Sequence, residues 1–515
     1  MGASEVNTLI LVLGNPWRRY PREYQWCEVT YRLDGGIECR DEIQEYVART
    51  TLPILYNCIK PDHMIIIAQD TLLVKEPQGN SYKDVIRIAE EVVREFLESV
   101  DRKLYEDIKD KIKIIVAPGL GRFVNTLVDN SGERQVEVNV CGSLQDFYSY
   151  LFHKLAYSLL RVISKSWGGD DAINLKVHLD LSHGINYMPA LTLKALLDII
   201  PVIAAYIDKG NPTNNSQGTR VTLITYNSEP VTRCGREHTY TIHVVEKLTV
   251  RDGGSFKLAP SLVAFENLKL MKANDACIRD PKRVREVGRG IGEASNRIVQ
   301  MLGLDKNMLS AFAGSLVNGL PLLLARTMPR TDLNSYVDRI LEKYIGTIEI
   351  STSSDNRGVK VEVHRKAKLA EASTAVAKLL LAKELIKITC EKARVKCEVN
   401  NDGSINLEDL EKLTPIAYSW SERLKTVISW DLWNIKKAVG NKRLEGWVKL
   451  YEILGDKSKC EDIFGSDLTR HFLQHSGLQM CIVDVKVENN NIMLRYDPEF
   501  EVTVMDMTSK GLVKI

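Results

Sequence analysis

The sequence predicts an α/β domain with a mainly parallel β-sheet, followed by a helical connector and an α-helical domain. Two observations predict this fold class. Up to about residue 250, short runs of Ile, Val and Leu alternate with segments of helical spacing, which is typical of parallel strands that helices cover on both faces. From residue 260 onward, apolar residues recur mostly at helical spacing instead. At 515 residues the chain is long enough for about two to four domains.

Five buried strands are expected in the N-terminal domain, which we expect to span residues 1–250. Each is a near-continuous apolar run that ends near turn-forming residues, and the runs are 8–13, 64–70, 113–119, 173–184 and 221–227. An amphipathic helix is predicted near 83–100. This alternation predicts a Rossmann-like domain, in which ligands bind beyond the carboxyl ends of the strands.

The connector is expected to span residues 251–365. Apolar residues at helical spacing predict four helices, at 261–271, 284–302, 308–325 and 333–344. Two short extended runs, 347–352 and 359–364, flank turn residues and predict a hairpin. Helices followed by a hairpin fit a winged helix-turn-helix, and they fit equally well a connector that only orients two domains.

The C-terminal domain is expected to span 366–515. It should contain two long helices, 366–390 and 407–439, and a closing hairpin made of 482–488 and 492–497. Basic residues gather in this domain, and such a cluster attracts phosphate backbones unless it is merely a solvated surface. The cluster consists of Arg423, Lys425, Lys436, Lys437, Lys442, Arg443 and Lys449.

Composition limits the possible functions. A formal charge of +2 argues against a strongly basic nucleic-acid coat but leaves room for a local basic patch. The ten cysteines form no CxxC motif, so zinc-ribbon and thioredoxin-type spacings are absent and buried thiols in a reducing compartment are expected. The N-terminus has no basic leader segment, and no later run approaches the roughly 20 apolar residues of a membrane span. A cytoplasmic protein without a membrane partner is therefore expected.

The segment 465–477, GSDLTRHFLQHSG, predicts a short capped helix that carries reactive groups. Ser466 and Asp467 can accept from free backbone N–H groups at its start, and Gly477 favours the left-handed conformation that ends a helix. The side chains able to hold a phosphate and to move protons are Arg470, His471 and His475. The partial negative charge of the helix end is expected to raise the pKa of His475.

The spacing of these three groups predicts a homodimer. At about 100° per residue, Arg470 and His475 lie roughly 140° apart around the helix axis, whereas His471 and His475 share a face. One isolated helix is therefore a poor catalytic site. Two copies facing each other across a two-fold axis would let each Arg470 reach the opposing histidine. Arginine and histidine at this spacing also occur by chance in many helices.

A second group of polar residues lies at two predicted strand ends. Gly14-Asn15-Pro16 leaves the first strand in a turn that can bring backbone close to a ligand. The segment 180–189, DLSHGINYMP, leaves a central strand and starts a helix whose free N–H groups suit a phosphate. Tyr187 could stack on a base or contact a ribose. The alternative is that His183 and Asn186 only cap the helix and satisfy the loop.

Standard nucleotide fingerprints are absent from the sequence. A dinucleotide-dependent oxidoreductase needs G-x-G-x-x-G after the first strand, and GNPWRR at 14–19 does not fit. GLGRF at 119–123 is incomplete and lies late in the sheet, and no Walker A motif occurs. The strand ends are therefore expected to bind phosphates of another kind of ligand.

Taken together, GNPW after the first strand, DLSHGINYMP after a later one and RHFLQHSGL in the C-terminal helices resemble the CRISPR-associated ribonucleases that join a CARF domain to a HEPN domain. The likeness is to the Csx branch, associated with type III systems, and it covers the whole chain. It implies that cyclic oligoadenylate, usually cyclic tetra-adenylate, binds as an allosteric activator where two CARF domains pair. The residues implied to surround the activator are Asn15, Trp17, Ser182, His183, Gly184, Asn186 and Tyr187.

The resemblance also implies a reaction in the HEPN domain. Single-stranded RNA is cut without a metal or cofactor, because the ribose 2′-hydroxyl attacks its own phosphate and leaves a 2′,3′-cyclic phosphate and a 5′-hydroxyl. Arg470 would stabilise charge on the phosphorane, and His475 would position or deprotonate the 2′-hydroxyl or protonate the leaving oxygen. His471 would be a second proton carrier or help to hold the dimer, which could be part of a higher oligomer. The sequence has no metal-ligand cluster, in agreement with this chemistry.

Other functions stay open on the sequence alone. A ligand-controlled transcription regulator would use the winged helix to bind duplex DNA. A ring nuclease would degrade the activator in the CARF pocket, where Ser182 and His183 are chemically able to take part. A nucleotide-dependent oxidoreductase is a more distant alternative, because it lacks its glycine fingerprint.

Overall fold

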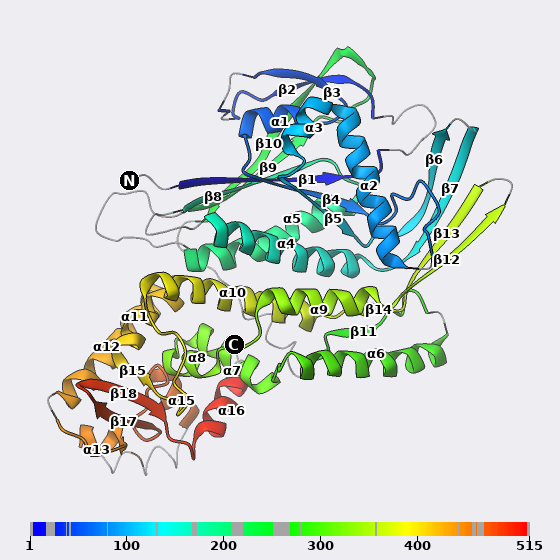
Figure 1. Cartoon of the computed structure of the whole chain (residues 1–515). Coiled ribbons are helices and arrows are strands. Elements are labelled where there is room, and N and C mark those ends of the chain that lie inside the picture. The colour runs from blue at the N-terminus through cyan, green and yellow to red at the C-terminus, as the bar shows by residue number, and fades with distance from the viewer. Residues whose placement is uncertain are drawn as a thin grey trace.

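The computed structural model has an α/β half and a mainly helical half, which lie one above the other in Figure 1. The residues that the structure describes are 4–16, 26–37, 39–40, 43–79, 81–129, 132–166, 173–207, 220–250, 268–278, 280–355, 358–440, 442–455, 460 and 468–511.

The main sheet has eight strands in the order β3-β2-β10-β9-β8-β1-β4-β5. Its five mutually parallel strands are β1 (Ser4–Leu13), β4 (His63–Gln69), β5 (Ile112–Ala117), β8 (Ile173–His183) and β9 (Arg220–Ser228). These are the five predicted strands, and the mainly parallel sheet is confirmed. Successive residues such as Leu9, Ile10 and Leu11 are all buried, because helices cover both faces of the sheet.

Three further strands extend the sheet beyond β9. They are β10 (Gly235–Val250), β2 (Val29–Leu33) and β3 (Glu45–Ala48). β10 runs antiparallel to β9, and β2 runs parallel to β10. The apolar runs do not predict these strands, because many residues of β10 and β3 are exposed or half-buried.

Helices cover the two faces of the main sheet, as Figure 1 shows. They are α1 (Leu52–Ile59), α2 (Tyr82–Val100) and α3 (Arg102–Ile108) on one side, and α4 (Leu144–Ser166) and α5 (Tyr187–Ile207) on the other. α2 is the amphipathic helix predicted near 83–100. It begins where the Ser81 hydroxyl accepts from the backbone N–H of Lys83 at 3.2 Å.

Helix α5 is long and apolar enough to cross a membrane, judged by length and composition alone. The expectation that no such run exists is therefore wrong. Within the protein, 61% of its apolar window is buried. There α5 contacts α4, α10 (Glu371–Ala393) and strands β1, β8 and β9, so it is a core helix between the sheet and the helical half.

A second sheet joins the two halves of the protein. Its strand order is β12-β13-β7-β6, and its strands are β6 (Gly121–Asp129), β7 (Gly132–Cys141), β12 (Ile348–Asp355) and β13 (Gly358–Arg365). The predicted hairpin is confirmed as β12 and β13. However, β13 also pairs in parallel with β7, for example Val361 with Val138. The hairpin is therefore bonded to the N-terminal domain and does not project as a free wing.

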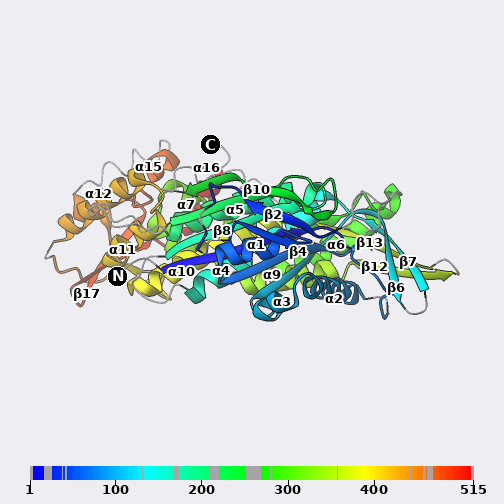
Figure 2. The same ribbon diagram turned by 90° about the horizontal axis from the view of Figure 1, so that it is seen from above.

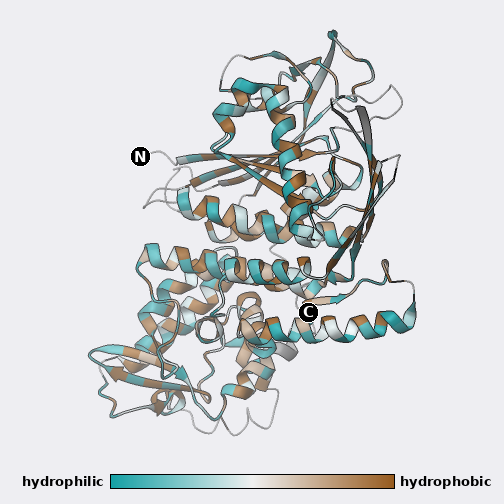
Figure 3. Cartoon of the chain, turned by 45° about the vertical axis from the view of Figure 1, so that its right-hand side comes forward, coloured by the Kyte–Doolittle hydropathy of each residue, from teal (hydrophilic) through white to brown (hydrophobic). Residues whose placement is uncertain are grey.

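Two connector helices agree with the predictions at 284–302 and 333–344. They are α6 (Pro281–Met301) and α9 (Leu333–Ile345). Asp280 and Asp332 cap them by accepting from backbone N–H groups. α6 is largely hydrophilic in Figure 3, which agrees with the few residues that it buries, whereas the strands of the main sheet are largely hydrophobic.

The predicted helix 308–325 is two helices in the structure. They are α7 (Lys306–Asn318) and α8 (Pro321–Thr327). The break follows from local chemistry, because Gly319 adopts a left-handed φ of 70° and ends α7. Pro321 then starts a new helix, where its missing N–H is not needed.

Two other predicted helices change at a short strand pair. The helix predicted at 366–390 starts later, as α10, because 367–369 form strand β14 (Ala367–Leu369) against β11 (Met271–Ala273). The helix predicted at 261–271 lies mostly outside the described residues, and its last residue, Met271, belongs to β11.

The C-terminal region is helical with a small sheet. The predicted helix 407–439 is divided into α11 (Leu407–Ala417) and α12 (Glu422–Val439), because the Ser421 hydroxyl accepts from the N–H of Leu424 at 3.3 Å and starts a second helix. The other elements are β15 (Ile405–Asn406), β16 (Val448–Lys449), α13 (Leu450–Leu454), α15 (Leu468–Gln474), β17 (Val483–Glu488), β18 (Asn491–Tyr496) and α16 (Glu501–Gly511). β17 and β18 confirm the closing hairpin. Figure 2 shows α12 and α15 at the opposite end of the molecule from β6, β7 and β13.

The cysteines contradict the expectation of buried free thiols. All ten are paired, as Cys27–Cys234, Cys39–Cys58, Cys141–Cys277, Cys390–Cys397 and Cys460–Cys481. Sequence spacing could not reveal two of these pairs, because the fold brings together segments that are 207 and 136 residues apart. Cys27 and Cys234, for example, lie beside the starts of the paired strands β2 and β10.

Candidate functional site

Helix α15 carries the predicted reactive groups and is held chiefly by the buried side chain of Phe472, with Leu468 and Leu473 packed partly against the core. Phe472 is fully buried and lies against Tyr496, with ring centroids 6.2 Å apart. Gly477 ends the segment with a left-handed φ of 72°, and its N–H donates to the carbonyl of Phe472 at 2.9 Å. The predicted helix and its closing glycine are therefore confirmed. Ser466 and Asp467, the predicted caps, lie outside the described residues.

The three reactive groups are arranged as the helical spacing predicts. His471 and His475 line the same groove, whereas Arg470 is exposed and does not line it. His475 lies one residue beyond the end of α15, and its N–H donates to the carbonyl of His471 at 3.2 Å. Its side chain is 56% exposed, so solvent or a substrate can reach the ring.

A carboxylate that the sequence did not point to lies beside His475. Asp431 of α12 places its Oδ1 3.9 Å from His475 Nδ1, and its side chain is only 16% exposed. The hydroxyl of Ser476 donates to the other oxygen, Oδ2, at 2.9 Å. The pKa of His475 is raised, chiefly by Asp431. The predicted direction is thus confirmed, and Asp431, which the sequence did not point to, is its first cause.

The groove has a volume of about 1110 Å³ and lies between α12, α13 and α15. Exposed apolar side chains surround it, since Val427, Trp430 and Leu454 are 41%, 62% and 42% exposed. Trp430 stacks on Trp433 with ring centroids 5.2 Å apart, and Lys437 Nζ lies 4.9 Å from the Trp433 ring. The arrangement combines a protonatable ring, a cation and an apolar surface.

Three of the seven residues of the predicted basic cluster form ion pairs with neighbouring carboxylates. Lys449 forms ion pairs with Asp484 and Asp497, and Lys436 pairs with Glu411. Lys425 pairs with Glu422, while Lys437 lines the groove. Only part of the cluster can therefore contribute to a basic patch near α15.

At the other end of the chain, the predicted activator residues gather at the carboxyl ends of β1 and β8. Asn15 is buried, and its Nδ2 donates to Asn125 Oδ1 at 2.5 Å. Ser182 belongs to the end of β8, where its hydroxyl donates to Asp180 Oδ1 at 2.5 Å and accepts from the N–H of Ser228 at 2.9 Å. The Ser182 hydroxyl therefore already has two partners in the sheet. Trp17, another predicted activator residue, lies outside the described residues.

His183 supports the neighbouring helix instead of capping its own. Its Nε2 accepts from the N–H of Thr51, the residue before α1, at 3.1 Å. Its ring lies against Trp26 with centroids 4.7 Å apart. Burial lowers the pKa of His183, so the ring is neutral near neutral pH. Ring-nuclease chemistry would need Ser182 and His183 to leave these partners.

The turn after β8 needs its glycine. A Cβ on Gly184 would lie 2.4 Å from the ring of Pro189 and 2.9 Å from Val12. Asn186 adopts a positive φ of 32°, which asparagine tolerates better than most residues. Tyr187 starts α5, and its hydroxyl accepts from Gln69 Nε2 at 2.5 Å and from the N–H of Leu120 at 3.2 Å. Tyr187 thus joins the ends of β4 and β5 to the predicted site.

Asp70 and Arg365 tie this edge to the connector, and the sequence did not predict either of them as part of the site. Arg365 comes from the end of β13, and both side chains of this ion pair are fully buried. Asp70 also accepts from the N–H of Gly119 at 2.7 Å, while Arg365 Nη1 donates to the carbonyl of Gly119 at 2.7 Å. The loop that contacts Tyr187 is therefore bonded to both halves of the protein.

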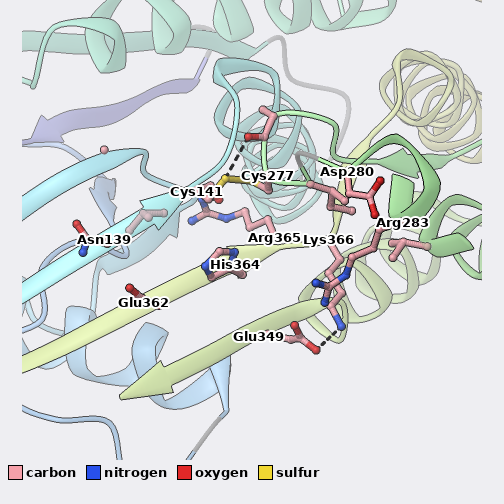
Figure 4. Close-up of a pocket in the computed structure, with 15 residues that line it drawn as sticks. Asn139, Cys141, Cys277, Asp280, Arg283, Glu349, Glu362, His364, Arg365 and Lys366 are labelled. Atoms are coloured by element: carbon pink, nitrogen blue, oxygen red, sulfur yellow. Dashed lines mark hydrogen bonds and ion pairs between the residues drawn. A yellow bond between two sulfur atoms is a disulfide. The ribbon is translucent and has the colours of Figure 1, made fainter. Parts of the chain in front are cut away.

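A further cavity, of about 820 Å³, lies where β7, β13 and the start of α6 meet (Figure 4). Charges of both signs line it, with Arg283 and Lys366 beside Glu349, and Lys366 pairs with Glu349. It shares no lining residue with the groove at α15. Among the described residues, no group of three or more His, Cys, Asp or Glu side chains is arranged to hold a metal ion.

The fold and the two candidate sites define a two-domain protein, in which a polar edge of a parallel sheet and a helix bearing arginine and histidine lie in separate domains. Residues 8–230 match the family model of the CARF domain of the CRISPR system endoribonuclease Csx1, and residues 421–499 match that of its HEPN domain. The CRISPR system endoribonuclease Csx1 of Methanocaldococcus jannaschii is 25% identical over 493 residues, which is 93% of this chain and 88% of the relative. The chain belongs to the CRISPR-associated CARF–HEPN ribonucleases.

Proposed function

We propose that the protein cuts single-stranded RNA in CRISPR defence when a cyclic oligoadenylate binds its N-terminal domain. The observation that carries the proposal is the groove in which His471 and His475 meet beside the Asp431 carboxylate. This groove lies within the residues that match the HEPN model. Cyclic tetra-adenylate is the activator we propose, and the cytoplasm is the compartment. The five disulfides of this chain would be unusual in the cytoplasm, where disulfides are rare except in proteins of hyperthermophiles.

The reaction needs only groups that this chain can supply. The ribose 2′-oxygen attacks the adjacent phosphorus while the bond from phosphorus to the 5′-oxygen breaks. The 2′-hydroxyl loses its proton and the leaving 5′-oxygen gains one, so that the products are a 2′,3′-cyclic phosphate and a 5′-hydroxyl. His475, with His471 as a second candidate, would move these protons, and Arg470 would stabilise the charge on the phosphorane.

A homodimer accounts for the position of Arg470. Because Arg470 does not line the groove that holds His475, we propose that it completes the site of a second copy across a two-fold axis. Exposed apolar side chains beside the groove, with Trp430 the most exposed of them, supply a surface for this contact.

The activator edge is proposed at the turns that follow β1 and β8. Asn15, Gly184, Asn186 and Tyr187 would face the ligand, together with Trp17. Ser182 and His183 would support the edge from within the sheet through their bonds to Ser228 and Thr51. The proposed domains are 1–250 for activator binding, 251–365 as connector and 366–515 for RNA cleavage.

The test is RNA cleavage with purified protein. We expect cleavage to require cyclic oligoadenylate, to persist in EDTA and to be lost in both Arg470→Ala and His475→Ala while activator binding is retained. A titration with cyclic tri-, tetra- and hexa-adenylate would identify the ring size. Cleavage that needs magnesium, or that survives both substitutions, would contradict the proposal.

A further inference from the structure

Asp431 is a partly buried carboxylate of the groove that contacts both the reactive His475 and the neighbouring Ser476. It lies on α12, 44 residues before His475 in the sequence, and its side chain is 16% exposed against 56% for His475. The two oxygens have different partners. Oδ2 accepts from the Ser476 hydroxyl at 2.9 Å, and Oδ1 lies 3.9 Å from His475 Nδ1.

We infer that Asp431 is a positioning residue for the cleavage reaction, which holds the His475 ring with Nδ1 toward α12 and Nε2 toward the RNA. This inference rests on the proposed function. A carboxylate beside one ring nitrogen fixes the tautomer and the orientation of an imidazole and stabilises its protonated form. The opposite nitrogen is then the one that faces the reacting phosphate.

Ser476 fixes the carboxylate in turn. It is buried, and its backbone adopts a left-handed φ of 50° in the turn between α15 and Gly477. This conformation is uncommon for serine, and here it aims the hydroxyl at Asp431 Oδ2. Because Oδ2 is occupied, Oδ1 is the oxygen left for His475. The Ser476 hydrogen bond to Asp431 therefore connects the turn after α15 to the middle of α12.

The surrounding charges make Asp431 the dominant influence on His475. Among the residues that the structure describes, the other charged or titratable groups lining the groove are Lys437 of α12 and His471 of α15, and neither is an anion. Asp431 is partly buried, so solvent screens its attraction for the imidazolium less than it would at the surface. The raised pKa of His475 has Asp431 as its first cause.

The test compares Asp431→Asn with Asp431→Glu. Asparagine keeps the shape and can still accept from Ser476, but it removes the charge. We expect Asp431→Asn to lower kcat about 10- to 100-fold with little change in KM, because a positioned acid or base contributes about 10²- to 10⁴-fold and only part of that is lost. Glutamate should restore part of the rate. The limb of the pH–rate profile that belongs to His475 should move to lower pH.

The controls separate this inference from the proposed function. Asp338→Asn, an exposed carboxylate on α9, should behave as the unaltered protein. His475→Ala should be inactive, and an active His475→Ala protein would overturn both the proposed function and the inference. If His475→Ala is inactive but Asp431→Asn keeps the rate and the pH profile of the unaltered protein, only the inference is overturned. Nuclear magnetic resonance titration of the His475 ring gives a second readout, in which Asp431→Asn should lower its pKa.

Discussion

At the scale of single residues, His178 is buried on β8 as a neutral ring because each of its nitrogens has a suitable partner. Asn7 Oδ1 lies 3.1 Å from Nε2 and can only accept, so Nε2 carries the proton, while Nδ1 accepts from the Tyr226 hydroxyl at 2.8 Å. Burial lowers the pKa of His178 from 6.5 to about 3. Between these values the unfolded chain binds a proton that the folded chain does not.

Acid should therefore destabilise the protein through His178. Stability from the neutral ring is fully present above pH 6.5 and is lost as the pH falls toward about 3. We expect this one group to lower the free energy of unfolding by about 1.4 kcal/mol per pH unit in that range. Urea unfolding at a series of pH values would measure it. In His178→Gln the free energy of unfolding should fall less steeply with decreasing pH, by the contribution of about one bound proton. Equal slopes in the two proteins would contradict the assignment.

The buried ion pair between Asp70 and Arg365 predicts a large effect of a single substitution. Arg365→Met leaves the Asp70 carboxylate buried without its partner, which should cost about 3 to 5 kcal/mol of unfolding free energy. Adding Asp70→Leu should recover much of this loss. Lys75→Met, which breaks the exposed pair with Glu91, is the control and should cost at most about 1 kcal/mol. Denaturant unfolding checks all three, and a double variant as unstable as the sum of the two single variants would contradict the expectation.

The sequence predicted those features of the site that depend on local spacing, but not the contacts made by residues from distant segments. Helical spacing is a local property, so it correctly placed His471 and His475 on one face with Arg470 off it. The raised pKa of His475 was predicted in direction only, because Asp431 reaches it from a helix that lies far away in the sequence. His183 was open between a ligand contact and a structural role, and its bond to Thr51 depends on the pairing of distant strands.

At the scale of elements, α15 depends on the glycine that ends it. A Cβ on Gly477 would lie 3.0 Å from the Tyr496 hydroxyl and 3.3 Å from Leu320, and its φ of 72° is unfavourable for alanine. We expect Gly477→Ala to cost about 1 to 2 kcal/mol of stability from the backbone alone. It should also reduce RNA cleavage, because the turn holds His475 and Ser476. The measurement is thermal unfolding together with cleavage rate.

Gly292→Ala is the matched control for that substitution. Gly292 lies inside α6, and a Cβ there meets nothing within 4 Å. Alanine favours a helix interior over glycine, so this variant should be slightly more stable, by up to about 1 kcal/mol, with unchanged cleavage. If the two variants have the same stability and cleavage rate, the positive φ and close contacts of Gly477 do not constrain the turn after α15.

The elements that the sequence predicted correctly are those whose signal is continuous along the chain. The five central strands are apolar on both faces, and α6 and α9 have helical spacing with an aspartate cap. Where one apolar pattern runs through two elements, as in α7 and α8, the spacing alone could not show the break at Gly319. Exposed strands such as β10 and β3 lack an apolar run altogether.

At the scale of the whole molecule, disulfides join segments that are distant along the chain. Cys27 and Cys234 are 207 residues apart, and Cys141 and Cys277 are 136 residues apart and link β7 to the start of α6. Closing long loops restricts the unfolded chain most, by about 5 kcal/mol for each of these two bridges in the chain-entropy model. We expect Cys141→Ser to lower the melting temperature more than Cys390→Ser, whose bridge spans 7 residues.

Whether the cysteines are free or disulfide-bonded can be measured directly by alkylation of the same purified protein. Mass spectrometry after alkylation without a reductant should find none of the ten cysteines modified. Reduction followed by alkylation should modify all ten and lower the melting temperature. Ready modification of Cys27 or Cys234 in the unreduced protein would contradict the pairing, and it would restore the original expectation of reduced thiols.

The proposed two-fold assembly makes the last prediction, because each cleavage site should combine groups from two copies. Arg470→Ala keeps His475, and His475→Ala keeps Arg470, so each variant alone is inactive. In a mixed dimer one of the two sites would contain both groups. Mixing equal amounts under conditions that exchange subunits should therefore restore roughly a quarter of the cleavage rate, since half of the dimers are mixed and each has one complete site.

Trp430→Ser distinguishes loss of assembly from loss of chemistry. Trp430 is 62% exposed beside the groove, and removing its ring should weaken self-association, which sedimentation velocity would detect. When this substitution is added to both inactive variants, mixing should no longer restore cleavage at low protein concentration. If mixing fails even where sedimentation shows that mixed dimers form, Arg470 and His475 act within one subunit. The exposed position of Arg470 outside the groove would then need another explanation.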